Sequence, residues 1–510
     1  MKKNIILSLI FCGQIFLAQN KSITFSLNKN TTSKDITPAG NSIDDIEISS
    51  NNNIWVINNK TVSLSTDNGK TWKNFTQDRF KESVVAVDSY NNEVWITLGK
   101  KIDGTDTGLG LVYTNDDGKT WSFIPQPKDS SGDSTIVYGI NRLRALPIVT
   151  NKQNISWDIA VTEKAVWIAS WGGGLRKSTD KGKTWQRIVL PPDNMSSIKP
   201  TDTLSFSLQP RSGNFGPENY YNHMAFSVET IGNDTILVGT GGGFNISFDG
   251  GISWRRISSQ DSENSISGNW VLDVTSNPFD KSIWISSRYS IFENEYNAVS
   301  ASFDFGKTWE TFLPNYKAWH IGFLKNEIIV PTESGLFVSS DNGETWINRS
   351  FITDSKNGLT LTASMFTYVK TNEKISPMEI WIGTNAGLVV NKTLSNFATG
   401  EKEILFKVGD AENKTKTFAF PNPFNPRKRL VNIKYYLSKP ANSVTIRIFN
   451  FDMTLVKTLI QNVSRNNYEA NVEYWDGTDN SGELLPNGVY FYRIDVDSDK
   501  PVFGKIVIIK

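Results

Sequence analysis

The segment STDNGKTW at residues 65–72 recurs five more times along this chain of 510 residues. Every copy has the form Ser/Thr-x-Asp-x-Gly-x-Ser/Thr-Trp, in which x is any residue. The other copies are TNDDGKTW at 114–121, STDKGKTW at 178–185, SFDGGISW at 247–254, SFDFGKTW at 302–309 and SSDNGETW at 339–346. A motif that recurs at intervals of tens of residues indicates a chain built from similar units that stack on one another.

A short apolar segment with the alternation of a β-strand precedes each copy. These segments are NIWVI at 53–57, EVWIT at 93–97, AVWIA at 165–169, TILVG at 235–239, SIWIS at 282–286 and EIIVP at 327–331. A seventh segment, EIWIG at 379–383, has no STDNGKTW-like copy after it. Both faces of such strands can be buried between stacked sheets. Because one four-stranded sheet cannot bury its faces alone, we expect seven sheets over residues 42–397 to close into a ring.

The repeated segment resembles the Asp-box, or bacterial neuraminidase repeat, of sialidase- and sortilin-like proteins. In that family it forms the turn between the two outer strands of a β-propeller blade. The resemblance implies an all-β chain with a seven-bladed β-propeller. In such a turn the aspartate accepts backbone N–H groups, the glycine takes positive φ and the tryptophan packs between sheets. We therefore expect structural, not catalytic, roles for Asp67, Asp116, Asp180, Asp249, Asp304 and Asp341.

The composition changes after a polar stretch at 398–417. Residues 418–510 are rich in predicted strands and turn residues, which favours a small β-sandwich. Pro421-Asn422-Pro423-Phe424-Asn425-Pro426, Trp475-Asp476-Gly477, Gly488-Val489-Tyr490 and the terminal KIVIIK resemble the FlgD-like immunoglobulin domain. That domain doubles as the type A C-terminal sorting signal of the type IX secretion system. The resemblance implies export across an outer membrane, followed by removal of the domain or surface attachment. An adhesive sandwich with no export role is the alternative.

The N-terminal residues indicate export as well. Two lysines precede an apolar run that ends near residue 18, so residues 1–19 read as a signal peptide, followed by an N-terminal segment at 20–41. The run is shorter than a membrane span, and we expect none in the mature chain. A lipoprotein signal around Cys12 is a further alternative. Together the two ends of the chain predict a secreted or cell-surface protein.

Composition excludes several kinds of chemistry. The 53 Lys and Arg residues nearly balance the 52 Asp and Glu residues, which argues against nucleic acid as a partner. Removal of residues 1–19 takes away the single cysteine, Cys12, and leaves only two histidines, His223 and His320. Disulfides, thiol nucleophiles, cysteine-ligated metals and three-histidine zinc sites are therefore excluded. We expect neither a metal nor a cofactor.

Four long segments between the predicted strands carry the variable part of the sequence. They are 99–108, 126–154, 191–221 and 288–298. In a propeller, the position of these segments between strands places them on the face opposite the repeated turns. Long loops on one end of a rigid scaffold are where binding sites usually lie. The sequence therefore predicts a ligand site on that face.

Some tryptophans belong neither to the repeated segments nor to the apolar strands that precede them, and their positions also favour a site on this face. Several of them lie at the starts of predicted inner strands, near the mouth of a central channel. The candidate ligand-binding residues are Trp157, Trp171, Tyr221, His223, Trp270, Arg288, Trp319 and His320, with Tyr220 and Tyr289 as neighbours. Aromatic platforms with a few polar groups suit sugar rings or peptide side chains. The alternative is that these rings fill the channel or pack between sheets, and that the histidines are structural.

Evidence for an enzyme is weaker. A sialidase needs three converging arginines, and the Arg-Ile-Pro motif expected before the first repeat is absent from 21–64. Arg142, Arg144, Arg211 and Arg288 lie in predicted loops, but nothing in the sequence brings them together. Xyloglucanase-type enzymes carry an Asp-x-Gly-Gly-x-Tyr-Arg segment and have two propellers. This sequence lacks that segment, and the chain has room for one propeller. Glycoside hydrolysis needs two carboxylates. The weak candidates are Asp158 and Asp273, with Glu218, Glu293 and Glu295 on loops.

These observations favour a secreted or surface propeller that binds a glycan or protein ligand through its loop-rich face. An extracellular glycoside hydrolase, sialidase-like or polysaccharide-cleaving, with carboxylates at the channel mouth is the alternative. The export module also makes the type IX secretion machinery an expected partner. An assembly factor similar to the photosystem II stability proteins fits that module poorly.

Overall fold

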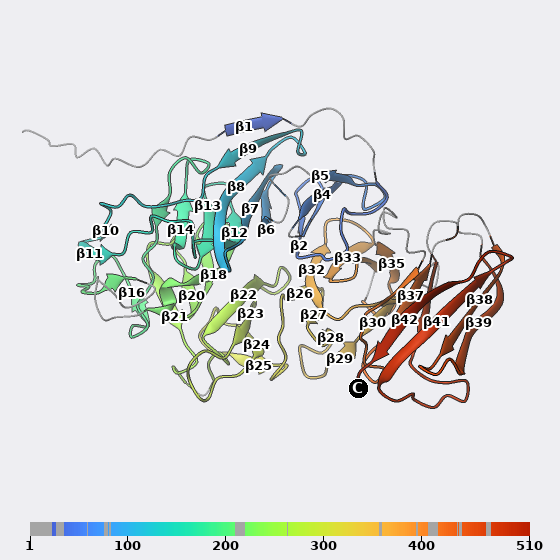
Figure 1. Cartoon of the computed structure of the whole chain (residues 1–510). Coiled ribbons are helices and arrows are strands. Elements are labelled where there is room, and N and C mark those ends of the chain that lie inside the picture. The colour runs from blue at the N-terminus through green and yellow to red at the C-terminus, as the bar shows by residue number, and fades with distance from the viewer. Residues whose placement is uncertain are drawn as a thin grey trace, which may run out of the picture.

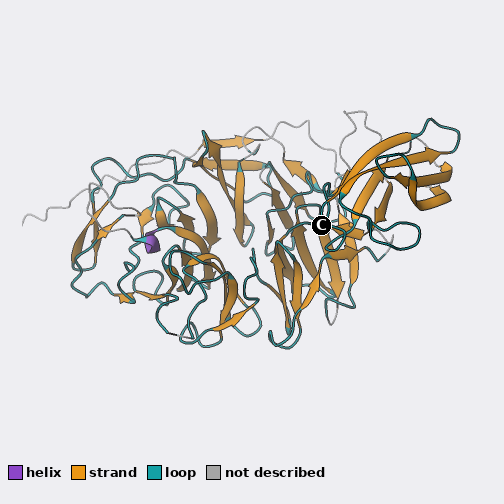
Figure 2. Cartoon of the chain, turned by 60° about the horizontal axis from the view of Figure 1, so that its bottom comes forward, coloured by secondary structure: helices purple, strands orange, loops and turns teal. Residues whose placement is uncertain are grey.

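The computed structural model describes residues 23–26, 35–58, 60–75, 80, 83–209, 220–262, 264–355, 360–393, 396–405, 417–435, 437, 441–465 and 471–510. In these residues the chain forms strands, loops and one 3₁₀ turn, η1 (Tyr221–His223), without an α-helix (Figures 1 and 2). The prediction of an all-β chain is confirmed. The predicted signal peptide at 1–19 lies outside the described residues.

Seven sheets of the described chain each contain four strands that follow one another in the sequence, and Figure 1 shows their first strands around a common centre. Sheet 1 has β2 (Asp45–Ile48), β3 (Ile54–Asn58), β4 (Thr61–Ser65) and β5 (Lys73–Phe75). Sheet 2 has β6 (Val84–Tyr90), β7 (Glu93–Ile102), β8 (Thr105–Thr114) and β9 (Thr120–Ile124). Sheet 3 has β12 (Ser156–Val161), β13 (Val166–Ser170), β14 (Gly174–Ser178) and β15 (Gln186–Arg187).

The remaining four sheets repeat this plan. Sheet 4 has β18 (Ala225–Ile231), β19 (Thr235–Thr240), β20 (Gly243–Ser247) and β21 (Trp254–Ile257). Sheet 5 has β22 (Trp270–Ser276), β23 (Ile283–Arg288), β24 (Ala298–Ser302) and β25 (Glu310–Phe312). Sheet 6 has β26 (Gly322–Leu324), β27 (Glu327–Thr332), β28 (Gly335–Ser339) and β29 (Ile347–Arg349). Sheet 7 has β32 (Phe366–Asn372), β33 (Met378–Thr384), β34 (Leu388–Thr393) and β35 (Glu401–Leu405).

The six repeated segments form the turns between the third and fourth strands of sheets 1 to 6. In the first turn, Asp67 accepts a hydrogen bond from the N–H of Thr71 at 2.8 Å, and Ser65 donates its hydroxyl to Asp67 at 2.9 Å. Gly69 has φ of +80°, which favours glycine, and the indole N–H of Trp72 donates to the Gly69 carbonyl at 3.1 Å. The same hydrogen bond, from a backbone N–H of the turn to the aspartate, recurs at Asp116, Asp180, Asp249, Asp304 and Asp341. These carboxylates are therefore used within their own turns.

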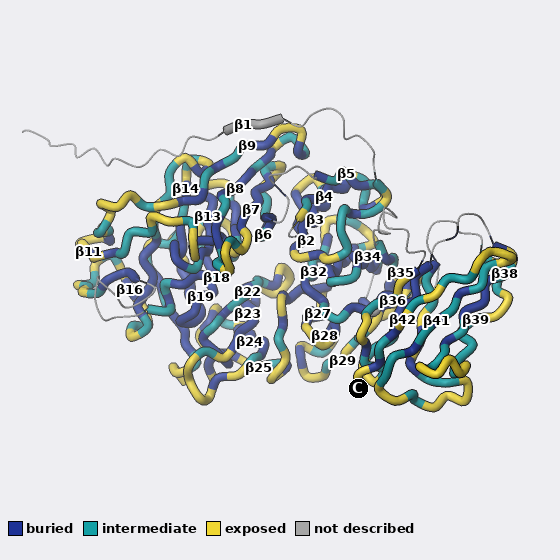
Figure 3. Tube along the Cα trace, in the orientation of Figure 1, coloured by how far each residue is buried: buried dark blue, intermediate teal, exposed yellow. Residues whose placement is uncertain are grey.

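The tryptophans of these turns pack against the neighbouring sheet. Trp121 of sheet 2 meets Trp55 of sheet 1 edge to face, with ring centroids 6.0 Å apart. Trp72 of sheet 1 meets Trp381 of sheet 7 in the same way at 6.1 Å. All four rings are buried, and Figure 3 shows that burial follows the strands of each sheet. Contacts between large apolar rings of adjacent sheets thus hold the stack together.

The described residues of two long segments, 126–154 and 191–209, run along the outside of sheets 3 and 4. Strands β10 (Thr135–Tyr138) and β11 (Asn141–Ala145) form a hairpin that pairs with β17 (Ser207–Leu208), and β16 (Ser197–Ile198) extends sheet 4 beyond β21. The Tyr138 hydroxyl donates to the carbonyl of Ile252, which lies in a repeated turn, at 2.8 Å. The prediction that 126–154 and 191–221 lie wholly on the face opposite those turns is therefore wrong. Their apolar side chains complete a core shared by sheets 3 and 4.

Other additions are smaller. Residues 99–108, predicted as a loop, instead extend β7 and β8 into a long hairpin that turns at Asp103 and Gly104. Strand β1 (Ile23–Ser26) adds to sheet 2 beside β9, and β30 (Phe351–Thr353) pairs with β31 (Thr360–Thr362) before sheet 7. Segment 288–298, which the sequence predicts as a loop, is irregular at 289–297.

The C-terminal residues form a separate β-sandwich. One sheet has β36 (Thr417–Phe420), β37 (Val431–Tyr435) and β40 (Asn471–Trp475). The other has β38 (Ala441–Phe449), β39 (Leu455–Arg465), β41 (Gly488–Val496) and β42 (Val502–Ile508). Buried side chains from both sheets, among them Trp475 and Tyr492, form one core. The prediction of a strand-rich sandwich is confirmed.

Candidate functional site

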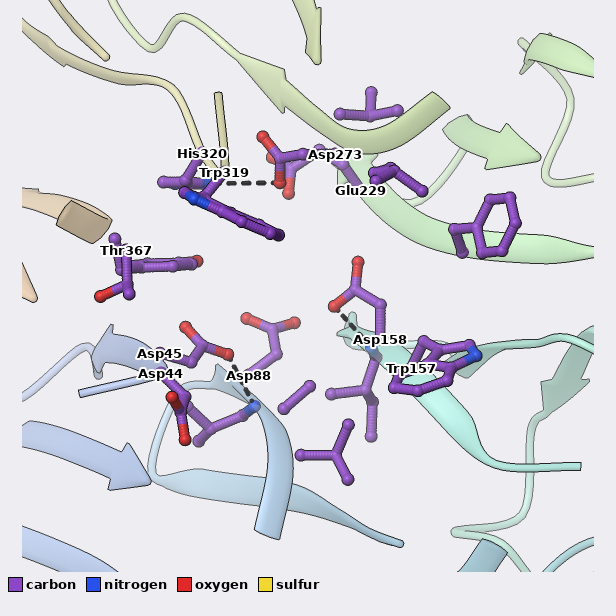
Figure 4. A pocket seen from close by; sticks show the side chains of 18 of the residues that line it. Asp44, Asp45, Asp88, Trp157, Asp158, Glu229, Asp273, Trp319, His320 and Thr367 are labelled. Atoms are coloured by element: carbon purple, nitrogen blue, oxygen red, sulfur yellow. Dashed lines mark hydrogen bonds and ion pairs between the residues drawn. The ribbon is translucent and has the colours of Figure 1, made fainter. Parts of the chain in front are cut away.

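The first strands of the seven sheets surround a cavity of about 350 Å³, which we call the channel (Figure 4). Every sheet contributes lining residues, and in each sheet one of them lies at an equivalent position at or near the start of the first strand. The residues at this position are Asp44, Val85, Trp157, Phe226, Leu272, Trp319 and Thr367. The wall of the channel is therefore assembled from positions that are far apart in the sequence and equivalent in the repeat.

In five sheets this lining residue is the extra residue of a β-bulge. In sheet 3, Ser156 pairs with Ser170 and Asp158 pairs with Ala169, so that Trp157 is bypassed in the ladder. The same irregularity occurs at Val85, Phe226, Leu272 and Thr367. Consecutive residues of a regular strand point to opposite faces. The bulge bends the strand and lets both Trp157 and Asp158 line the channel.

Carboxylates in the channel join the first strands of sheets 1 to 5 to the sheet that follows each of them. Three of them accept a backbone N–H: Asp45 from Val87 at 3.0 Å, Asp88 from Val161 at 2.6 Å, and Asp158 from Val228 at 2.8 Å. Glu229 of sheet 4 accepts the hydroxyl of Ser276 in sheet 5 at 3.0 Å. Asp273 of sheet 5 lies 3.1 Å from Nδ1 of His320, just before sheet 6. These acids therefore have a structural role, whatever else they do.

Burial shifts the protonation of these carboxylates. It raises the pKa of Asp45 to about 6, although the hydrogen bond from the Val87 N–H opposes this shift. Burial also raises the pKa values of Asp88 and Asp158 well above their usual range, and it raises the pKa of Glu229. A group of carboxylates that water reaches poorly thus holds protons at mildly acidic pH.

One lysine lies among these acids. Nζ of Lys370 in β32 is 2.6 Å from Oε2 of Glu47. Although burial opposes its charge, the carboxylates of Glu47, Asp88 and Glu229 raise the pKa of Lys370. Among the described lining residues, seven are carboxylates and only Lys370 and His320 are basic. The lining of the channel therefore has a large excess of carboxyl groups over basic groups.

A second cavity, of about 560 Å³, lies at the channel mouth, and we call it the vestibule. Trp157, Phe226, Leu272 and Trp319 line both cavities, so the vestibule leads into the channel. Trp171 completes the apolar wall, and the polar lining comes from the tip of the β7–β8 hairpin and from Gln153. Trp157 is 36% exposed and Trp319 is 41% exposed. Such exposure of large rings around a hollow is typical of a ligand-binding surface.

The structure brings together part of the residue set predicted from the sequence. Trp157, Trp171 and Trp319 line the vestibule, and Trp270 packs behind Trp171 with ring centroids 5.9 Å apart. His320 lies in the channel, stacked on Tyr368 at 3.9 Å between centroids. The candidate acids Asp158 and Asp273 also line the channel.

Other predicted residues lie elsewhere. Tyr221 and His223 belong to η1 and line neither cavity, and burial with the nearby guanidinium groups of Arg176 and Arg187 lowers the pKa of His223 to about 4. Arg288 is buried beneath Trp319, with its guanidinium 5.5 Å from the centre of that ring.

The proposed arginine and glutamate candidates do not converge in the described structure. Arg142 and Arg144 lie in β11, on the outside of the sheets, and Arg288 is behind the vestibule wall. Glu295 accepts hydrogen bonds from Asn269 and Ser259 and is structural, while Glu293 is exposed on its loop. Arg211 and Glu218 lie outside the described residues.

The Asp45→Asn variant is expected to gain stability relative to the wild type as pH rises from about 4 to about 6. The folded-state pKa of about 6 exceeds the usual value of 3.8, so the protonated carboxyl stabilises the fold below pH 4. That contribution is lost as pH rises through 6. Asparagine carries no charge, so the difference in unfolding free energy should change by about 3 kcal/mol and stay constant above that interval. Urea unfolding at pH 4, 5, 6 and 7 measures it, and a pH-independent difference would contradict the assignment.

Neither a metal centre nor a membrane span is found in the described part of the chain. Its residues contain no group of three or more His, Cys, Asp or Glu side chains arranged to hold a metal ion. They also contain no helix with the length and apolar character that a bilayer crossing requires.

A known sequence family matches part of the C-terminal sandwich. Residues 427–500 match the sequence model of the FlgD Ig-like domain. The C-terminal sandwich is Ig-like. This agrees with the resemblance seen in its motifs, since the match extends from before β37 almost to β42. No curated protein matches the chain in sequence.

Solved structures with a similar path are remote in sequence. PorZ, an essential surface component of the type IX secretion system of Porphyromonas gingivalis, is 15% identical, with a TM-score of 0.42 over 93% of this chain and 60% of PorZ. YCF48 bound to D1 peptide is 16% identical, with a TM-score of 0.43 over 74% of this chain and 98% of YCF48. An ancestral GH74 enzyme is 13% identical, with a TM-score of 0.49 over 92% of this chain and 63% of that enzyme. The chain thus spans less than two thirds of PorZ and of the GH74 enzyme.

Sequence reasoning missed several lining residues. Asp45, Asp88, Glu229 and Lys370 all lie in first strands, and Phe226 occupies a bulge. A signal for the charged residues was present, because acidic side chains recur in most first strands of the repeat. The bulge that turns Phe226 inward has no comparable signature, since it is a property of strand pairing.

Proposed function

We propose that this chain is a secreted or cell-surface protein whose seven sheets close into a β-propeller and whose vestibule binds a glycan or protein ligand. Support for closure comes from the hydrogen bonds that join successive first strands and from contacts between sheets 1 and 7, such as Trp72 against Trp381. The observation that carries the binding function is the vestibule itself. Two exposed rings, Trp157 and Trp319, and the partly buried rings of Trp171 and Phe226 surround one hollow that continues into the carboxylate-lined channel.

Binding is favoured over catalysis by the state of the candidate acids. Both oxygens of Asp158 accept backbone N–H groups, from Ile159 at 2.8 Å and from Val228 at 2.8 Å. Asp273 accepts the hydroxyl of Thr275 at 3.1 Å and lies beside His320. Each acid is thus engaged in holding first strands, whereas a nucleophile or general base needs access to substrate.

Replacing Trp319 by alanine is expected to weaken ligand retention at least tenfold with little effect on thermal unfolding. The ring is 41% exposed in the vestibule, so its removal takes away a contact surface but little core. The purified full-length chain is passed over immobilised extracellular glycans and proteins, and its retention is compared with that of the variant. Phe451→Ala, which removes an exposed ring of the C-terminal sandwich, is the control and should be retained normally. A large drop in the melting temperature of Trp319→Ala would place the ring in the core instead.

A glycoside hydrolase remains the second candidate because one observation favours it. The raised pKa of Asp158 is what a general acid requires at neutral pH, and Asp273 lines the same channel. The glycans of the retention experiment are therefore also incubated with the chain and assayed for new reducing ends. Retention without new ends supports binding alone, whereas ends that disappear in Asp158→Asn would establish hydrolysis.

We further propose that residues 418–510 direct export through a type IX secretion system and are then removed or used for surface attachment. The match to the FlgD Ig-like domain and the terminal KIVIIK segment support this assignment. A reporter protein fused to residues 418–510 and carrying a signal peptide should leave the cells of a bacterium that has this system. Export of the reporter that persists without KIVIIK would contradict the proposal.

A further inference from the structure

We propose that the vestibule and the channel together bind an alkylammonium chain, the side chain of a lysine presented by a protein ligand. The proposal rests on the binding function proposed above and specifies its ligand. It follows from the order of surfaces along the two cavities: apolar side chains line the passage that they share, and most of the carboxylates line the channel alone.

Four apolar side chains at the channel mouth, which we call the collar, can surround an aliphatic chain. Trp157, Phe226, Leu272 and Trp319 line the passage from the vestibule to the channel. Indole and phenyl rings make favourable contacts with methylene groups and with a cation above their faces. One face of Trp319 already contacts the Arg288 guanidinium, at 5.5 Å from its centre. The collar therefore suits a slender side chain with a cationic end.

Carboxylates lie directly behind the collar. Figure 4 shows the carboxylates of Asp45, Asp88 and Asp158 directed toward the open centre of the channel, with Glu229 on the other side. Lys370 pairs with Glu47 at 2.6 Å and also interacts with Asp88 and Glu229, but seven carboxylates line the channel against this lysine and His320. An ammonium group that enters from the vestibule would thus meet several carboxylates in a poorly hydrated space, where their attraction for a cation is stronger than in water.

This order of surfaces distinguishes a lysine from an amino sugar. A lysine places four methylene groups between its backbone and its ammonium, so the apolar stem meets the collar while the charge reaches the acids. An amino sugar carries its ammonium on a ring covered with hydroxyl groups, which would need polar partners at the collar. In the described residues those partners are confined to the outer part of the vestibule, at Thr105, Asp106 and Gln153.

Binding should depend on pH. Burial raises the pKa of Asp45 to about 6. The other titratable groups that line the channel are Asp44, Glu47, Asp88, Asp158, Glu229, Asp273, His320, Tyr368 and Lys370. A bound ammonium favours the charged carboxylates, so protons compete with it below about pH 6. The affinity for a lysine peptide is expected to fall about tenfold from pH 7.5 to pH 5.

The test is calorimetric titration of the full-length chain with the peptide acetyl-Ser-Gly-Lys-Gly-Ser-amide at pH 7.5. The matched peptide with norleucine in place of lysine keeps the stem without the charge and should bind at least tenfold more weakly. The double variant Asp88→Asn with Glu229→Gln keeps the acceptors for Val161 and Ser276 and removes two charges. It should lose about tenfold in affinity for the lysine peptide, whereas Glu310→Gln on an outer strand should lose none.

Three results would overturn this inference. Equal affinity for the lysine and norleucine peptides would remove the role of charge. Unchanged lysine affinity in the double variant would place the cation elsewhere. Binding of glucosamine oligomers but not of the lysine peptide, with loss in Trp319→Ala, would leave the proposed binding function intact and replace the ligand by a glycan. If no ligand of either class requires Trp319, the proposed function itself fails.

Discussion

Alanine in place of Trp381 is expected to lower the free energy of unfolding of the seven-sheet unit by about 3–5 kcal/mol. The indole of Trp381 in sheet 7 is fully buried and packs edge to face on Trp72 of sheet 1 at 6.1 Å. A Cβ atom added to Gly69, in the same turn as Trp72, would lie only 2.5 Å from the Trp381 ring. Removal of this ring leaves a cavity between the first and last sheets that neither turn nor strand can fill.

Urea unfolding followed by far-ultraviolet circular dichroism measures the loss. The double variant with Trp72→Ala should show a coupling of about 1 kcal/mol, because the two rings contact each other directly. Trp346→Ala is the control, since that ring belongs to a repeated turn but is only partly buried, and its loss should be smaller. A cost below about 1 kcal/mol for Trp381→Ala would argue against a ring closed between sheets 1 and 7.

The second large effect is expected at Lys370. Replacement by methionine should cost about 2 kcal/mol at pH 7.5, because Glu47, Asp88 and Glu229 lose the cation that faces them, while the partial exposure of the lysine keeps the cost below that of a fully buried ion pair. The loss should diminish as pH falls toward 5. In the variant the carboxylates hold protons to higher pH than in the wild type, so the penalty is present above their folded-state pKa values and absent below them.

Lys392 provides a control that distinguishes the loss of a shared cation at Lys370 from the loss of any lysine charge. Lys392 lies 3.7 Å from Glu379, and 32% of its side chain is exposed, against 34% for Lys370. Lys392→Met should cost less than about 1 kcal/mol, as expected for a single partly exposed ion pair. Equal costs for the two variants, or a cost at Lys370 that does not vary with pH, would show that the acids do not depend on this lysine.

The sequence predicted the sheets well and the site in part, for reasons that differ by residue. The repeated turns are local, because the aspartate, glycine and tryptophan of one turn interact with one another, and so their spacing alone identifies them. Trp157, Trp171 and Trp319 were identifiable because they interrupt the repeat. Tyr221 and His223 were not separable from these, because their turn packs beside the cavities instead of lining them.

The channel acids were missed for a different reason. Asp88 and Glu229 belong to the acidic positions that recur in first strands, but only the arrangement of neighbouring sheets places them around one space. Segments 126–154 and 191–221 show the converse. Their length predicted exposed loops, but apolar residues such as Leu143 and Leu208 cover the outside of sheets 3 and 4. The residue type at a single position does not reveal that it is buried by segments distant in the sequence.

At each bulge in a first strand, the side chain that lines the channel belongs to a residue that does not take part in strand pairing. Because a bypassed residue such as Phe226 or Leu272 is skipped by the ladder, exchange of its side chain leaves the flanking pairs in register. Each bulge is therefore a point at which the preference for one molecule over another can be rewritten without redesign of the scaffold. A combinatorial library restricted to these positions would explore new specificities while the framework stays constant.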